Sequence, residues 1–208
     1  NSKIKELKKI IKPGMTVLDI GANIGFYSKL FSKLVGAEGR VYSFEPEEEN
    51  FEYLKKNTKE CNNVVINKMA VSDKSGKMKL YISDDLNVDH NVYDNGEGRK
   101  TCEIDAVSLD DYFIDKDIDI NFIKIDVQGF DYYAILGGEK TISKSKKVDI
   151  LSEFWPFGLH KAGVGPYQYL ELIKRMGFKV DLDDGSLSGL DEKIDDKMFI
   201  LDFFASKS

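Results

Sequence analysis

The sequence is poor in the residues that cross-link small proteins or bind structural metals. It contains two cysteines and two histidines among 208 residues. Cys61 and Cys102 lie far apart, with neither the Cys-x-x-Cys spacing of a zinc site nor the paired pattern of a disulfide framework. We therefore expect no structural zinc, no disulfide and a reducing compartment.

The sequence also lacks a long apolar run and an excess of positive charge. No run approaches the roughly 18 to 20 apolar residues that span a bilayer, and no signal peptide is recognisable. The 36 Asp and Glu residues outnumber 30 Lys and Arg, for a formal net charge of −6. Because a nucleic-acid footprint needs a clustered basic surface, we expect no nucleic acid as a partner. From the lack of a long apolar run and of a signal peptide we expect no membrane span and a cytoplasmic protein.

Short apolar runs alternate along the chain with segments of helical periodicity. The composition, 42% apolar and 32% charged, is typical of globular domains. The alternation predicts an α/β fold: a doubly wound, mostly parallel seven-stranded Rossmann-like sheet with helices on both faces and an antiparallel C-terminal hairpin. We expect a single domain over residues 1–208, with a leading helix within 1–14 and a substrate-side loop at 84–100.

The individual elements are predicted by their ranges. Parallel strands are expected at 17–20, 40–46, 64–66, 118–127 and 148–154, an antiparallel pair at 77–83 and 101–107, and closing strands at 177–182 and 197–204. Helices are expected at 24–34, 47–60, 130–141 and 167–176, and an aromatic loop at 155–160.

A glycine-bearing turn follows the first predicted strand. The apolar run Val17–Ile20 stops at Gly21, and Gly25 stands where a helix can begin close to that strand. Glycine permits backbone conformations that side chains disfavour, and a helix N-terminus presents unpaired N–H groups to the turn. The pattern is typical of a turn that holds a small polar ligand, although plain strand–helix connections share it.

Asn23 and Glu45 narrow the choice of ligand. Asn23 occupies the place of the second glycine in Gly-x-Gly-x-x-Gly, which disfavours a pyrophosphate. Glu45 ends the next predicted strand 24 residues after Gly21 (45 − 21), about the spacing at which an acid accepts hydrogen bonds from ribose hydroxyls. S-adenosylmethionine, a common nucleoside cofactor without a pyrophosphate, fits both observations.

Further polar residues stand at predicted strand ends. Asp126 lies at the end of a nearly continuous apolar strand, Glu153 lies at the end of the following one, and residues 69–73 follow the third strand where an adenine would lie. In doubly wound sheets, ligands bind beyond the carboxyl ends of the strands. We therefore expect these residues to surround one crevice with Gly21 and Glu45.

With these residues the chain resembles the class I S-adenosylmethionine-dependent methyltransferases, and among them the FkbM family. The matching motifs are Val17–Gly25, Phe44–Pro46, Asn67–Asp73, Ser108–Asp111 and Ile123–Asp131. The resemblance implies an O-methyltransferase acting on hydroxyls of sugars, polyketides and related products. One departure is Gln128, where the family usually has glutamate; an amide can orient a substrate but cannot serve as a base.

The resemblance implies a set of cofactor contacts. The glycine turn is expected around the amino acid end of S-adenosylmethionine, the second strand end at the ribose, and residues 70–72 at the adenine edge. The expected cofactor-binding residues are Asp19, Gly21, Asn23, Gly25, Glu45, Pro46, Ala70, Val71, Ser72 and Asp126.

Methyl transfer to a hydroxyl requires two positioned reactants and a base that removes the hydroxyl proton. We assign Asp126 first, because a central strand end would place it near the methyl group; capping the next helix or orienting the cofactor's amino group is its alternative role. Glu153 is the second candidate for the base, and its alternative role is a structural salt bridge. His160 and His90 follow as candidates for the base or for acceptor contacts. A divalent metal on Asp126, Glu153 and a histidine is chemically feasible, but no spacing requires it and none is expected.

The sequence therefore predicts an S-adenosylmethionine-dependent O-methyltransferase that acts on a small-molecule or glycan acceptor, a carbohydrate or a secondary metabolite. Two alternatives stay open. A nicotinamide-dependent oxidoreductase on a related sheet is disfavoured by Asn23, and a non-catalytic module that binds a nucleoside cofactor is suggested only by Gln128.

Overall fold

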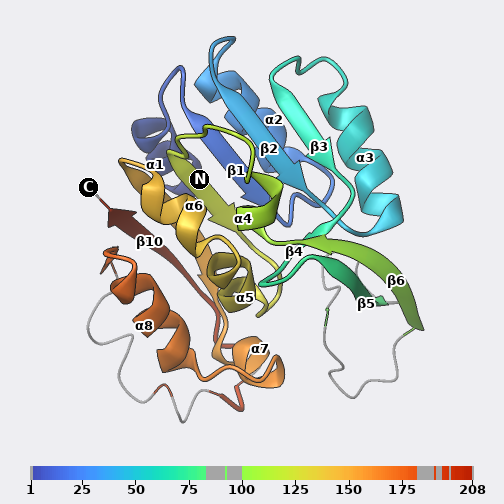
Figure 1. Ribbon diagram of the computed structural model, residues 1–208, viewed down its shortest axis with the longest axis vertical. Helices are drawn as coiled ribbons and strands as arrows, with labels where there is room; N and C mark the ends of the chain where they lie inside the picture. Colours follow the sequence, from blue (N-terminus) through green and yellow to red (C-terminus); the bar gives the residue numbers. More distant parts are fainter. Residues whose placement is uncertain are drawn as a thin grey trace.

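A computed structural model describes residues 2–82, 92, 100–181, 190, 194–196 and 198–207. Its main feature is a seven-stranded sheet in the order β3-β2-β1-β7-β8-β10-β9, flanked by helices (Figure 1). The first five strands of this order run parallel, and β10 is antiparallel to β8 and β9. The strands are β1 Thr16–Ile20, β2 Arg40–Phe44, β3 Val64–Asn67, β7 Phe122–Ile125, β8 Val148–Phe154, β9 Lys179–Asp181 and β10 Leu201–Lys207. The predicted fold class is confirmed.

Alternating side chains of the strands build two apolar layers. Val17 and Phe122 pack on one side of the sheet with residues of α1 and α2. Leu18 and Ile123 pack on the other side with residues of α4, α5, α6 and α8. The helices are α1 Ser2–Ile10, α2 Phe26–Val35, α3 Glu48–Thr58, α4 Leu109–Tyr112, α5 Asp131–Leu136, α6 Glu139–Lys144, α7 Pro156–Lys161 and α8 Pro166–Arg175.

A second, three-stranded sheet stands to one side of the large one in the order β4-β6-β5 (Figure 1). The predicted antiparallel pair is confirmed as β5 Gly76–Ile82 and β6 Lys100–Val107, and β4 Ala70–Val71 joins β6 in parallel. Of the predicted loop at 84–100, only Val92 and Lys100 belong to the described residues, so its role at the substrate stays a prediction.

The predicted strand at 118–127 is too long at both ends, because the structure limits β7 to Phe122–Ile125. Before β7, side chains tie the chain to its neighbours: Asp119 accepts a hydrogen bond from the backbone N–H of Lys146, and Asn121 accepts one from Thr16. After β7, Gln128 adopts a positive φ of 54° and ends the extended conformation.

Two further element predictions are corrected. The helix expected at 130–141 is two helices, α5 and α6, separated by Gly137 and Gly138. A Cβ at Gly137 would lie 1.9 Å from the carbonyl oxygen of Ser72, so this crossing depends on glycine. The aromatic loop expected at 155–160 contains helix α7, which begins at Pro156, a residue whose fixed φ suits a first helical position.

Within the described ranges, every helix is too short or too polar to span a lipid bilayer.

Candidate active site

The glycine turn lies at the carboxyl end of β1, directly against the chain that leaves β7. Gly21 and Gly25 have positive φ values of 75° and 88°, and Asn23 between them has 50°. The backbone N–H groups of Gly21 and Ala22 donate to the carbonyl of Phe44, 3.0 and 2.9 Å away. A Cβ at Gly21 would lie 2.0 Å from the carbonyl oxygen of Asp126. Glycine is therefore required where the ends of β1 and β7 meet.

The Glu45 carboxylate faces this turn from the end of β2. One of its oxygens accepts the N–H of Asn23 at 2.8 Å, and the other accepts the N–H of Glu47 at 3.0 Å. Glu45 is 5% exposed, and burial raises its pKa to about 7. Each carboxylate oxygen retains a second lone pair, which a ribose hydroxyl can use. The residues present thus fit a nucleoside cofactor at this position.

A buried polar network lies beneath the turn. The hydroxyl of Ser28 donates to Asp19 at 2.6 Å, and the ammonium of Lys124 lies 3.5 Å from the other oxygen of Asp19. Lys124 also donates to the carbonyl of Gly21 at 2.7 Å and lies 3.6 Å from Asp126. Burial raises the pKa of Asp19. Burial alone would lower the pKa of Lys124, but the negative charges of Asp126 and Asp19 outweigh this effect and raise the pKa of Lys124.

Asp126 directly follows β7, Glu153 lies near the end of the neighbouring strand β8, and the side chain of Gln128 contacts both acids. The Nε2 group of Gln128 donates to Asp126 at 3.2 Å and to Glu153 at 3.3 Å. The Asp126 side chain is 41% exposed. Burial, followed by the charges of Asp126 and Asp131, raises the pKa of Glu153 to about 8. The two predicted bases therefore share one site and differ in their surroundings.

Lys124 and Asp131 are absent from the predicted site. Asp131 is 1% exposed at the start of α5 and accepts hydrogen bonds from the N–H of Gly129 at 3.2 Å and the hydroxyl of Ser152 at 3.3 Å. Burial and the charge of Asp126 raise the pKa of Asp131 to about 7. The sequence offers one signal, since Lys124 interrupts an otherwise apolar strand.

In the described part of the chain, the remaining predicted residues form no hydrogen bond or ion pair with this network. Ala70 and Val71 are buried in β4, and Ser72 donates its N–H to the carbonyl of Val107. Pro46 is half-buried beside Glu45, and His160 is exposed on α7. Their proposed contacts stay predictions, and His90 lies outside the described residues. In the part of the chain that the structure describes, no group of three or more His, Cys, Asp and Glu side chains could hold a metal ion.

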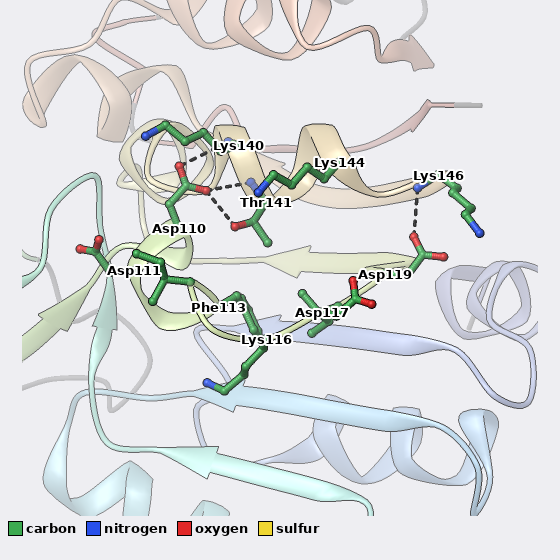
Figure 2. Close-up of a pocket in the computed structure, with 12 residues that line it drawn as sticks. Asp110, Asp111, Phe113, Lys116, Asp117, Asp119, Lys140, Thr141, Lys144 and Lys146 are labelled. Atoms are coloured by element: carbon green, nitrogen blue, oxygen red, sulfur yellow. Dashed lines mark hydrogen bonds between the residues drawn. The ribbon is translucent and has the colours of Figure 1, made fainter.

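A cavity of about 460 Å³ lies elsewhere, between α4, the segment before β7 and α6 (Figure 2). Two of its acids serve local structure: Asp110 accepts the N–H of Thr141 at 2.8 Å, and Asp119 accepts that of Lys146 at 3.0 Å. The cavity is adjacent to the amino ends of β7 and β8, whereas the candidate site uses their carboxyl ends. It contributes no residue to that site.

The order of the sheet and the site at its carboxyl edge define the class I methyltransferase fold. The chain belongs to the family of the methyltransferase FkbM domain, whose family model matches residues 19–180. The resemblance seen in the sequence is confirmed.

Solved structures share this fold at low sequence identity. The methyltransferase FkbM of Methylobacillus flagellatus KT is 16% identical with a TM-score of 0.51, covering 85% of this chain and 46% of its own. A SAM-dependent methyltransferase from Aquifex aeolicus is 19% identical with a TM-score of 0.50, and the match covers 100% of this chain and 98% of the Aquifex chain. Aeropyrum pernix fibrillarin, solved with natively bound S-adenosyl-L-methionine, is 11% identical with a TM-score of 0.56. The match covers 100% of this chain and 74% of the fibrillarin chain.

A shorter sequence match points to ribosomal RNA large subunit methyltransferase E of Acinetobacter baumannii. This relative is 55% identical over 38 residues, and the matched segment spans only 18% of this chain and 18% of the relative.

Proposed function

We propose that the protein transfers the methyl group of S-adenosylmethionine to a hydroxyl of a carbohydrate or secondary metabolite. The main support is that the glycine turn, the Glu45 carboxylate and the partly exposed Asp126 carboxylate stand at one edge of the sheet. The first two fit a nucleoside without a pyrophosphate, and the third supplies a proton acceptor beside it. Family membership supports the same reaction class.

The proposed cofactor contacts rest on side chains of the turn, because the backbone N–H groups of residues 21–25 all donate within the protein. We propose Asn23 at the amino acid end of the cofactor and Glu45 at the ribose hydroxyls. When bound, S-adenosylmethionine supplies a methyl group on sulfur, whose transfer breaks the C–S bond and leaves the electron pair on sulfur. The chain's own residues orient the acceptor oxygen and accept its proton.

Asp126 is the proposed base, and Glu153 is the proposed partner of the acceptor. At neutral pH Glu153 carries a proton, because burial and the neighbouring carboxylates raise its pKa to about 8. A neutral carboxyl can donate a hydrogen bond to an acceptor oxygen. Asp126, with 41% of its side chain exposed, is accessible to an acceptor and is proposed to take the hydroxyl proton.

An RNA acceptor is the second candidate, because a 38-residue segment matches ribosomal RNA large subunit methyltransferase E. The partly exposed carboxylate of Asp126 would repel a phosphodiester backbone, and the net charge of −6 adds to this repulsion. We therefore favour an uncharged, hydroxyl-bearing acceptor. We also propose one domain over residues 1–208 and a cytoplasmic location, which the low cysteine content fits.

Calorimetry with S-adenosylmethionine and NAD, followed by transfer assays with methyl-labelled cofactor, tests the function. The acceptor panel contains glycans, hydroxylated metabolites and ribosomal RNA. We expect binding of S-adenosylmethionine only, and label in a glycan or metabolite in a linkage stable to mild base, as an ether is. Preferential binding of NAD, or label in RNA alone, would contradict the proposal.

A further inference from the structure

Gln128 occupies the junction between the two candidate catalytic carboxylates. Its single Nε2 group donates one hydrogen bond to Asp126 at 3.2 Å and another to Glu153 at 3.3 Å. An amide NH₂ group carries two hydrogens, so both contacts can form at once. The side chain therefore bridges the end of β8 and the first residue beyond β7.

The backbone around Gln128 is held in an uncommon conformation. Gln128 has a φ of 54° and Gly129 has 88°, both in the left-handed region. A Cβ at Gly129 would lie 2.3 Å from the carbonyl carbon of Gly158, and one at Gly158 would lie 2.2 Å from the Trp155 ring. The segments after β7 and β8 are thus packed backbone to backbone. A non-glycine residue at positive φ persists where its surroundings hold it there.

The charges around this bridge explain why an amide is useful. Glu153 faces the carboxylates of Asp126, Asp131 and Asp202, with Lys124 as the opposing charge. Lys124 is already engaged by Asp19 and the carbonyl of Gly21. Asp202 stands opposite Glu153 on β10 and pairs with Lys3. A further carboxylate at position 128 would add repulsion, whereas an amide donor provides attraction to both neighbours.

We propose that Gln128 is a positioning residue that holds Asp126 and Glu153 together on one acceptor, so that Asp126 receives the hydroxyl proton while Glu153 hydrogen-bonds the acceptor oxygen. The inference rests on the proposed function. It assigns to Gln128 the orientation of the acceptor rather than a loss of activity.

Substituting Gln128 should change Glu153 in a predictable direction. In the wild-type protein the Nε2 donor of Gln128 stabilises the charged form of Glu153. Gln128→Met keeps the length of the side chain but removes this donor. Gln128→Glu replaces the donor with a like charge. Both changes disfavour ionisation, so each should raise the pKa of Glu153, the second more than the first.

The experiment is a ¹³C NMR titration of Glu153 in protein labelled at glutamate, with the signal assigned from Glu153→Gln. We expect an upward shift of about one pH unit in Gln128→Met and a larger one in Gln128→Glu. Gln168→Glu is the matched control: it makes the same chemical change at the exposed start of α8, where a carboxylate can still accept the N–H of Gly165. An unchanged Glu153 titration in both Gln128 variants, or an equal shift in the control, would overturn the inference.

Kinetics separate positioning from a general structural role. In Gln128→Met we expect kcat to fall about tenfold, while the KM for S-adenosylmethionine stays within about twofold. A change in that KM alone would also overturn the inference. If the wild-type protein binds no S-adenosylmethionine, the proposed function fails; the NMR titration still decides whether Gln128 controls Glu153.

Discussion

The ammonium of Lys124 lies 3.5 Å from the carboxylate of Asp19, and both side chains are almost completely buried. The pair connects two neighbouring strands, since Asp19 lies in β1 and Lys124 in β7. Among the described residues, the Oδ1 atom of Asp19 has no hydrogen-bond partner, so the charge of Lys124 is its compensation. The same ammonium donates to Gly21 and thereby joins the buried pair to the proposed cofactor turn.

Removing Lys124 should destabilise the fold and loosen the turn. Lys124→Met leaves the Asp19 carboxylate buried without its positively charged partner, for which we expect a loss of about 3–5 kcal/mol in the free energy of unfolding. Denaturant titration measures this loss. Lys77→Met is the control, because Lys77 forms an exposed ion pair with Asp105 at 2.6 Å and should change stability little. Equal stability of the two variants would contradict the prediction.

The buried acids should make the protein less stable as the pH rises. The pKa of Glu45 is raised in the folded state from its ordinary value of 4.5 to about 7, and that of Asp131 from 3.8 to about 7. Between those values the folded state binds more protons than the unfolded state, so the free energy of unfolding falls with increasing pH. The contribution is present below about pH 4 and is lost by about pH 7.

Denaturant titrations at several pH values measure this slope. Asp131→Asn removes one of the acids with a raised pKa and should flatten the curve between the folded and unfolded pKa values of that residue. A wild-type protein whose stability rises from pH 4.5 to 7 would refute the assignment of raised pKa values.

Glu45→Gln should weaken cofactor binding more than folding. A glutamine can accept only one of the two backbone N–H groups and loses the negative charge available to ribose hydroxyls. We expect the Kd for S-adenosylmethionine to rise by roughly 10- to 100-fold by calorimetry. Glu48→Gln, a change at an exposed acid of α3, serves as the control. Similar affinities of the two variants would place the ribose elsewhere.

Asp126→Asn should impair the reaction more than binding. An amide cannot accept the hydroxyl proton, so we expect kcat to fall by about 100-fold or more. Steady-state kinetics and calorimetry on the same sample separate the two effects, with exposed Asp105→Asn for comparison. A loss confined to S-adenosylmethionine affinity would assign Asp126 to the cofactor instead of the base.

Local patterns in the chain were sufficient to predict which residues of the candidate site lie close together. Gly21, Asn23 and Glu45 were predicted near one another because strand ends in a parallel sheet meet at one edge, and the hydrogen bond between Glu45 and Asn23 bears this out. The break at Gly137 escaped prediction, because it depends on the close passage of Ser72, a residue distant in the sequence.

The sequence by itself determined the alternation of strands and helices, the glycine turn and the acids at strand ends, because periodicity and turn chemistry act over a few residues. Tertiary structure decided that Lys124 pairs with Asp19 and that Gln128 bridges Asp126 and Glu153. These contacts join different strands, and the ionisation of their groups depends on burial and on charges brought together only when the sheet forms.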